Sequence, residues 1–245
     1  MPSDCHTLAA ANLRPGEHVC CLYQSTDELP GLLIPFVQHG LARGEKVCCV
    51  GDAPLLRDIY ERLRASMPQF DALIRERQLV MLAPEEWLPG GPCGLADWLA
   101  RETELILKEG WSALRFTWEA EDILRASLDA GRPVETELTE KEASIEAAVE
   151  GARLAALCRY RYQSFSADAL LRAMAVHPLI MAGGRLCENP DHIPCAALHS
   201  AEGLVQRRLA NLLALEQIRN TVRQSEERYR RIVESAADAF FVHDL

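Results

Sequence analysis

The stretch "KVCCVGD", residues 46 to 52, holds four consecutive apolar residues between Lys46 and Gly51. Apolar runs of strand length without polar alternation are typical of strands that are covered on both faces, as in a parallel sheet. The next segment, "PLLRDIYERLRAS", has the apolar spacing of a helix. The stretch therefore predicts a strand followed by a helix, the repeating unit of an α/β fold.

The same alternation continues along the first 195 residues. We expect further strands in the segments "VCCLY", "QLVMLAPEEWL", "SALRFTWEAED", "ALCRYRYQSF" and "PLIMAGG". Helices are expected over residues 26–41 and over residues 136–157, and the Gly40 and Gly44 pair is interpreted as a helix stop and a tight turn. The pattern predicts a mostly parallel sheet flanked by helices.

Composition narrows the classes of function. The chain has 245 residues, of which 49% are hydrophobic and 25% charged, so it can bury a full core. The formal net charge of −10 argues against nucleic-acid binding, which depends on Lys and Arg. Nine cysteines without a signal-peptide pattern predict reduced thiols in a cytoplasmic protein, and no apolar run approaches the ~20 residues needed to cross a bilayer.

Phosphate-binding loops are missing from the sequence. Neither G-x-x-x-x-G-K-[ST] nor G-x-G-x-x-G occurs, and "HGLARGEK" lies between a helix and a strand rather than between a strand and a helix. We therefore expect no enzyme in this segment. A RecA-like nucleotide-binding enzyme is kept as an alternative, and the sequence names no cofactor.

The order of several motifs resembles that of a known sensory family. The segments are "HVCCLY", "PFVQHGLARGEKVCCVGD", "LRFTWEAEDIL", "LAALCRYRYQSFSADALLRAMAVHP" and "ENPDHIP". Over residues 15–197 they are similar to the MEDS domain, the methanogen/methylotroph DcmR-type sensory domain. The matching positions are His18, Cys20, Tyr23, Phe36, Gly40, Leu41, Gly44, Glu45, Cys158, Tyr160, Phe165, His177, Pro178, Asn189 and Pro190. The resemblance implies a RecA-like sheet without a working phosphate loop, in an input domain that senses small compounds.

The stretch "EHVCCLYQS", residues 17 to 25, raises the question of a metal site. On a strand, His18, Cys20 and Leu22 share one face, and the residues between them share the other. A cluster of His18, Cys20, Cys48 and Cys158 would suit zinc, iron or copper. Buried cysteine also serves as a small apolar residue, so core packing, a pocket wall, and a metal or thiol-redox sensor all stay open.

A small-molecule pocket is expected where the strands end. Trp118 and Glu119 follow one another at the carboxyl end of a predicted strand, where α/β folds place their ligands. The candidate ligand-binding residues are His18, Cys20, Tyr23, Trp118, Glu119 and Cys158. No nucleophile-and-base set accompanies them, so no catalytic residue is proposed.

The end of the chain predicts a signalling helix. From Leu204 to Ile232 there is no Gly or Pro, and a 4-3 spacing predicts a dimer seam at Leu215, Ile218, Val222, Tyr229 and Ile232. Residues 235–245, which include "AFFVHDL", resemble the first strand of a PAS domain. We therefore expect an N-terminal tail (1–14), a sensory domain (15–197), a dimerising helix (198–234) and the start of a truncated PAS domain (235–245). The expected protein is a small-molecule sensor, fused to PAS and histidine kinase modules of a two-component system, without membrane insertion by this segment.

Overall fold

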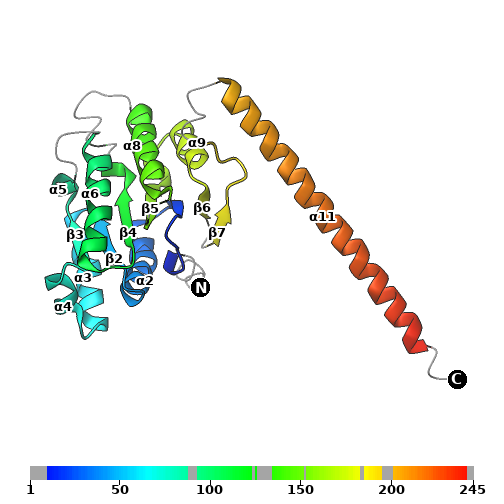
Figure 1. The fold of residues 1–245 in the computed structure, drawn as a ribbon, viewed down its shortest axis with the longest axis horizontal. Helices are drawn as coiled ribbons and strands as arrows, with labels where there is room; N and C mark the ends of the chain where they lie inside the picture. Colours follow the sequence, from blue (N-terminus) through cyan, green and yellow to red (C-terminus); the bar gives the residue numbers. More distant parts are fainter. Residues whose placement is uncertain are drawn as a thin grey trace. The chain divides into compact units, whose positions relative to one another are not determined.

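A computed structural model describes residues 10–87, 93–122, 125, 134–151, 153–182, 185–194 and 201–241. The chain divides into two compact units, the first reaching residue 195 and the second beginning at residue 196. The first unit is an α/β layer structure and the second is a single long helix, α11 (Figure 1).

One mostly parallel sheet forms the centre of the first unit. Its strands lie in the order β3-β2-β4-β5-β1-β6-β7, and only β7 runs antiparallel to its neighbour. The strands are β1 (His18–Tyr23), β2 (Lys46–Val50), β3 (Leu79–Leu82), β4 (Leu114–Glu119), β5 (Leu154–Arg161), β6 (Leu179–Ala182) and β7 (Arg185–Glu188).

Helices cover both faces of this sheet (Figure 1). They are α2 (Leu29–Ala42), α3 (Ala53–Ser66), α4 (Phe70–Arg75), α5 (Pro84–Trp87), α6 (Cys93–Glu109), α8 (Val134–Val149) and α9 (Ala167–Val176), with 3-10 turns η1 (Thr26–Glu28) and η2 (Tyr162–Ser164). Side-chain caps mark the start of two of these helices. The Asp52 carboxylate accepts a hydrogen bond from the Leu55 amide at the start of α3, and the Ser166 hydroxyl caps α9 in the same way.

The connections explain which helices cover which face. From β1 the chain passes through α2 to β2 and through α3 and α4 to β3, always in one direction along the sheet. It then returns in the opposite direction through α6, α8 and α9 to β4, β5 and β6. Because crossovers between parallel strands are right-handed, this reversal places the second set of helices on the opposite face. Two separate apolar cores result, one on each face.

The fully buried strand β2 contributes to both cores. Cys48 and Val50 pack in the core under α6 and α8, whereas Val47 and Cys49 pack in the core under α2 and α3. Strand β1 alternates in the same way, since Cys20 and Leu22 belong to the first core and Val19, Cys21 and Tyr23 to the second. The expected α/β fold with a mostly parallel sheet is confirmed.

Several local expectations are corrected. Gly40 lies inside α2 rather than stopping it. A glycine fits this position because a Cβ would come within 2.8 Å of the Arg115 side chain. The tight turn does occur at Gly44, which has φ +72°. The helix expected over residues 136–157 ends at Val149, and Gly151 at φ +70° precedes β5. Three expected strands are shorter than predicted, since residues 84–87 form α5, residues 120–122 are helical and residues 162–164 form η2. Strand β7 was not expected.

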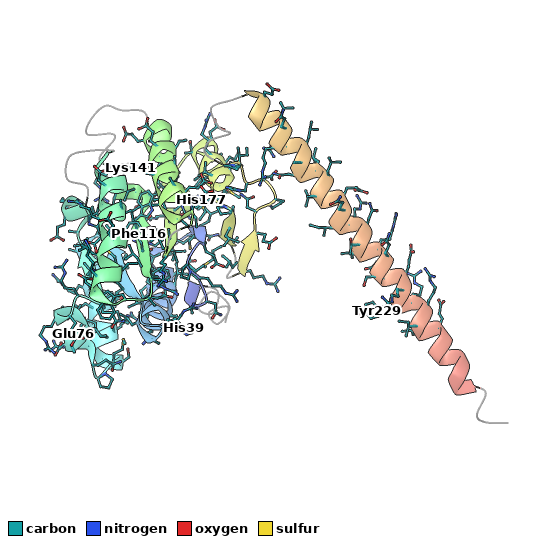
Figure 2. All side chains as sticks on the ribbon, viewed as in Figure 1. His39, Glu76, Phe116, Lys141, His177 and Tyr229 are labelled. Carbon is teal, nitrogen blue, oxygen red and sulfur yellow. The ribbon has the colours of Figure 1, made fainter. Side chains whose placement is uncertain are left out.

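Helix α11 (Ala201–Phe241) forms the second unit. At 1.5 Å per residue it is ~60 Å long, and apolar side chains such as Tyr229 stand exposed on it (Figure 2). The strand expected at "AFFVHDL" is wrong for Ala239 to Phe241, which are helical, and residues 242–245 lie outside the described ranges. Among helices of the described ranges, none has the length and apolar character needed to cross a bilayer.

Candidate functional site

The sheet has a topological switch point at its carboxyl edge. Neighbouring strands β2 and β4 send the chain to opposite faces, as do the neighbours β1 and β5. Diverging connections leave a crevice above the strand ends, which is where open α/β sheets bind their ligands. We call this feature the carboxyl-end cleft.

The carboxyl-end cleft has a volume of about 360 Å³ and opens to solvent. Its walls come from the segments that follow β1, β2 and β4. The apolar part of the lining consists of Tyr23, Leu29, Pro30, Pro54 and Leu55. The acidic part consists of Asp27, Asp52, Asp58, Glu119, Glu121 and Asp122, against the two lining cations Arg62 and Arg125.

A buried arginine ties the strand ends together beneath the cleft. Arg159 of β5 donates Nε–H to the Trp118 carbonyl at 3.2 Å and Nη2–H to the Val50 carbonyl. Its Nη1 lies 3.8 Å from Oε2 of Glu119, which is its register partner on β4. One side chain therefore connects β2, β4 and β5 where their backbones end.

Two carboxylates in the cleft are buried without adequate partners. Both carboxylate oxygens of Glu119 and Oδ2 of Asp122 lack a hydrogen bond of normal geometry within the described residues. Burial raises the pKa of Glu119 to about 7, although Arg159 and a hydrogen-bonding contact from the Tyr23 hydroxyl oppose this change. Burial also raises the pKa of Asp122 to about 6, again opposed by Arg159. A ligand with hydrogen-bond donors or a positive charge would satisfy these carboxylate oxygens.

The cysteines of the core are not activated thiols. Burial raises the pKa of Cys21 and of Cys49 to about 12, and it raises the pKa of Cys20, Cys48 and Cys158 well above the ordinary thiol value. Reactive cysteines need a lowered pKa and access to solvent. These five residues have neither, which disfavours thiol-redox sensing.

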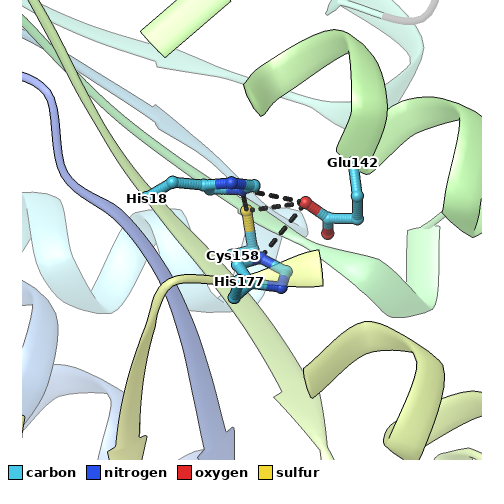
Figure 3. A group of neighbouring side chains, drawn as sticks. All are labelled: His18, Glu142, Cys158 and His177. Carbon is cyan, nitrogen blue, oxygen red and sulfur yellow. Dashed lines mark hydrogen bonds and ion pairs between the residues drawn. The ribbon is translucent and has the colours of Figure 1, made fainter. Parts of the chain in front are cut away.

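A second group of polar residues is buried on the other face of the sheet. His18 of β1, Glu142 of α8, Cys158 of β5 and His177 after α9 each present one polar atom, and these atoms all lie within 4.8 Å of one another (Figure 3). We call these four residues the His-Glu-Cys-His cluster. Oε2 of Glu142 is 3.0 Å from His18 Nε2 and 3.2 Å from His177 Nε2.

The electrostatics of this cluster follow from its burial. Burial and the neighbouring His177 together lower the pKa of His18 to about 4, although Glu142 opposes this change. Burial works to raise the pKa of Glu142, but His177 and His18 together hold it well below its ordinary value. The cluster therefore combines a carboxylate with an uncharged His18 ring.

The structure divides the predicted ligand-binding residues between the two places. Tyr23 and Glu119 line the carboxyl-end cleft. His18 and Cys158 belong to the His-Glu-Cys-His cluster, and Trp118 joins them by donating Nε1–H to the Cys158 sulfur at 3.0 Å. Cys20 packs in the adjoining apolar core. Of the four predicted metal ligands, His18 and Cys158 come together, whereas Cys20 and Cys48 are outside the group of ligand atoms found in the described residues.

Sequence reasoning missed three important residues: Glu142, Arg159 and His177 as a site residue. Glu142 is one of many acidic residues in a helical segment, and only the packing of α8 on the sheet singles it out. Arg159 had a usable signal, since a charged residue inside the run "LAALCRYR" is unusual for a buried strand.

Comparison with known families gives the last observation. Residues 17–178 match the model of the MEDS domain, described as the MEthanogen/methylotroph, DcmR Sensory domain. The chain belongs to the MEDS family. The match spans the first unit from β1 to the start of β6, so it includes both the carboxyl-end cleft and the His-Glu-Cys-His cluster. No curated protein matches the chain. Membership of the MEDS family identifies the first unit as a sensory domain.

Proposed function

We propose that this MEDS domain senses a small organic cation, which binds in the carboxyl-end cleft. The supporting observation is the pair of buried carboxylates, Glu119 and Asp122, three of whose oxygens lack a hydrogen bond of normal geometry within the described residues. The Tyr23 hydroxyl and Arg159 lie close to Glu119 without completing that geometry. Buried polar groups are nearly always satisfied in folded proteins, so unsatisfied acceptors facing a cleft are a reason to expect a ligand there.

The lining favours a donor-rich ligand over an anionic one. Three unsatisfied carboxylate oxygens belong to residues that line the cleft. Two guanidinium nitrogens near it are also unsatisfied within the described residues, Nη1 of Arg159 and Nε of Arg161, but each of these arginines already lies 3.8 Å from a glutamate of the cleft. Three other lining acids are already engaged, since Asp52 caps α3, Asp58 pairs with Arg62 and Glu121 accepts a hydrogen bond from Ser164. Tyr23, Leu29 and Leu55 add apolar surface. An ammonium group on a short apolar chain matches both features, whereas a nucleotide phosphate would be repelled by the carboxylates.

Helix α11 is the proposed output of the sensor. Leu215, Ile218, Val222, Tyr229 and Ile232 are exposed on it and repeat at coiled-coil spacing. We propose that two chains pair through this seam in the cytoplasm, and that the helix passes the ligand signal to PAS and kinase modules in the same chain. The contribution of the segment itself is binding rather than catalysis.

A thermal-shift screen tests the ligand class. The 245-residue chain would be melted with ethylammonium, ethanolamine, ethanol and propionate, each at millimolar concentration and pH 8. A ligand at one hundred times its Kd stabilises a protein by about 2.7 kcal/mol. We expect the ammonium compounds to raise the Tm and propionate to leave it unchanged. Stabilisation by propionate alone, or by none of the four probes, would contradict the proposal.

A further inference from the structure

The His-Glu-Cys-His cluster has the spacing of a metal site. Beside the two distances from Glu142 Oε2 to the imidazoles, His18 Nε2 lies 3.3 Å from the Cys158 sulfur, and that sulfur lies 3.4 Å from Glu142 Oε2. Tetrahedral zinc with bonds of ~2.0–2.3 Å requires its ligand atoms to be ~3.3–3.7 Å apart. The cluster is therefore close to this size before any ion is bound.

The orientation of His177 supports the same conclusion independently. Its Nδ1 lies 2.6 Å from the Ala173 carbonyl, to which only an Nδ1–H can donate. The neutral ring then presents the lone pair of Nε2 to the cluster. Nε2 is fully buried and makes no hydrogen bond of normal geometry, although Glu142 Oε2 is 3.2 Å away. Two lone pairs cannot face each other at this distance without a positive charge between them, which is either a proton on Nε2 or a metal ion. A backbone partner on the second ring nitrogen is the usual support of a metal-binding histidine.

Neighbouring aromatic residues hold both anionic ligands in place. The Tyr160 hydroxyl donates to Oε1 of Glu142, which leaves Oε2 directed at the other three residues. Trp118 Nε1–H donates to the Cys158 sulfur. Hydrogen bonds of this kind orient metal ligands and stabilise their charged forms. Both aromatic side chains are fully buried, so they keep these positions.

The charge of the donor set matches a divalent ion. One thiolate, one carboxylate and two neutral imidazoles carry a total charge of −2. In a fully buried site, a dication neutralises this charge and satisfies all four donor atoms. Mixed nitrogen, sulfur and oxygen donors favour zinc over magnesium or calcium, which prefer oxygen alone.

We propose that His18, Glu142, Cys158 and His177 bind one zinc ion. The ion joins β1, β5, α8 and the residue that leads into β6, so it ties helices of one face to the centre of the sheet. With four protein ligands and no exposed ligand atom, the site is of the closed, structural type. This site is distinct from the carboxyl-end cleft, and the inference does not depend on the ligand proposed there.

Elemental analysis of the purified 245-residue chain tests the proposal. We expect about one zinc ion per chain, as for structural zinc sites in general. Cys158→Ser and His177→Gln should lose most of the zinc. The matched controls are Cys20→Ser and Cys48→Ser, which change equally buried thiols outside the cluster and should keep it. Trp118→Phe removes a supporting hydrogen bond and should weaken zinc binding about 10- to 100-fold.

Cobalt substitution separates loss of metal from loss of folding. The wild-type chain loaded with Co²⁺ should show a thiolate-to-cobalt charge-transfer band, and Cys48→Ser should show the same band. A folded wild-type chain, judged by circular dichroism, that takes up neither zinc nor cobalt from excess metal would overturn the proposal. Equal zinc loss in Cys48→Ser and Cys158→Ser would overturn it as well.

Discussion

Glu119 and Arg159 are register partners on adjacent strands, and their side chains meet 3.8 Å apart beneath the carboxyl-end cleft. The guanidinium is fully buried and the carboxylate nearly so. Arg159 also donates hydrogen bonds to the carbonyls at the ends of β2 and β4. The same arginine therefore contacts a carboxylate that lines the cleft and holds the strand ends together. A ligand that neutralises Glu119 would therefore act directly on the group that organises the strand ends.

Removal of Arg159 should be strongly destabilising. Arg159→Met leaves the buried Glu119 carboxylate without its nearby charge and frees two carbonyls, and breaking a buried pair in this way costs about 3–5 kcal/mol. Denaturant unfolding would measure the loss. Arg161→Met is the control, because Arg161 lies at the same distance of 3.8 Å from its glutamate, Glu121, but is partly exposed to solvent. Similar losses in both variants would argue against a special role for Arg159.

Stability should fall as the pH rises through the range set by Glu119. Its pKa is about 7 in the folded protein, against an ordinary value of 4.5, so the folded state binds more protons between these pH values. The free energy of unfolding therefore decreases from pH 4.5 to 7, by at most about 3 kcal/mol for this group.

Glu119→Gln should make this decrease smaller, as measured by urea unfolding at pH 5 and pH 7.5. Asp122 contributes a further decrease in both proteins, since its pKa of about 6 is also raised. Glu188→Gln changes an exposed carboxyl on β7 and should leave the profile as it is. An unchanged profile in Glu119→Gln would show that Glu119 does not titrate as expected.

Two glycines of α2 should respond in opposite directions to alanine. Gly40→Ala places a methyl group 2.8 Å from both Arg115 and Val47, so overpacking should cost about 1–3 kcal/mol. Gly31→Ala meets nothing within 4 Å and should gain about 0.5–1 kcal/mol from helix propensity. Thermal unfolding of the two variants provides the comparison. Equal effects would contradict the close approach of Arg115 to α2.

The seam on α11 predicts a dimer that a single charge disrupts. Val222→Glu places a carboxylate in the proposed seam and should shift the chain toward monomer, whereas Gln224→Glu adds the same charge at an exposed position outside it. Sedimentation equilibrium of both variants and the wild type would measure the change. A wild-type chain that stays monomeric at high concentration would remove the support for relay through this helix.

Sequence periodicity was sufficient for the elements with the strongest pattern. The apolar run of β2 predicts a strand covered on both faces, and the alternation in β1 places His18 and Cys20 on one face and Tyr23 on the other. Gly151 shows the limit, because a helical apolar pattern continued through residues 154–157 while the local turn ended α8 earlier. Strand β7 has four residues and little burial, too weak a signal to predict.

The candidate sites needed tertiary structure. His18 and Cys158 could be proposed together because both lie on predicted strands, but their partners depend on which turn of α8 faces the sheet. Glu142 occupies that turn, and nothing in "TELTEKEASIE" separates it from the other glutamates. His177 precedes a proline, a position where the backbone is usually held extended, and its approach to Glu142 depends on how α9 packs. Physical proximity, rather than residue type, identifies both.

The most direct test of the proposed sensing function is a calorimetric titration of ethylammonium into the 245-residue chain at pH 8, where Glu119 and Asp122 are mostly ionised. We expect binding to the wild type, weaker binding at pH 5.5 where both groups are largely protonated, and at least about tenfold weaker binding to Glu119→Gln, which corresponds to about 1.4 kcal/mol. Glu188→Gln should bind like the wild type. Absence of binding at millimolar concentration, or equal affinity in Glu119→Gln, would contradict the assignment of the carboxyl-end cleft as a cation sensor.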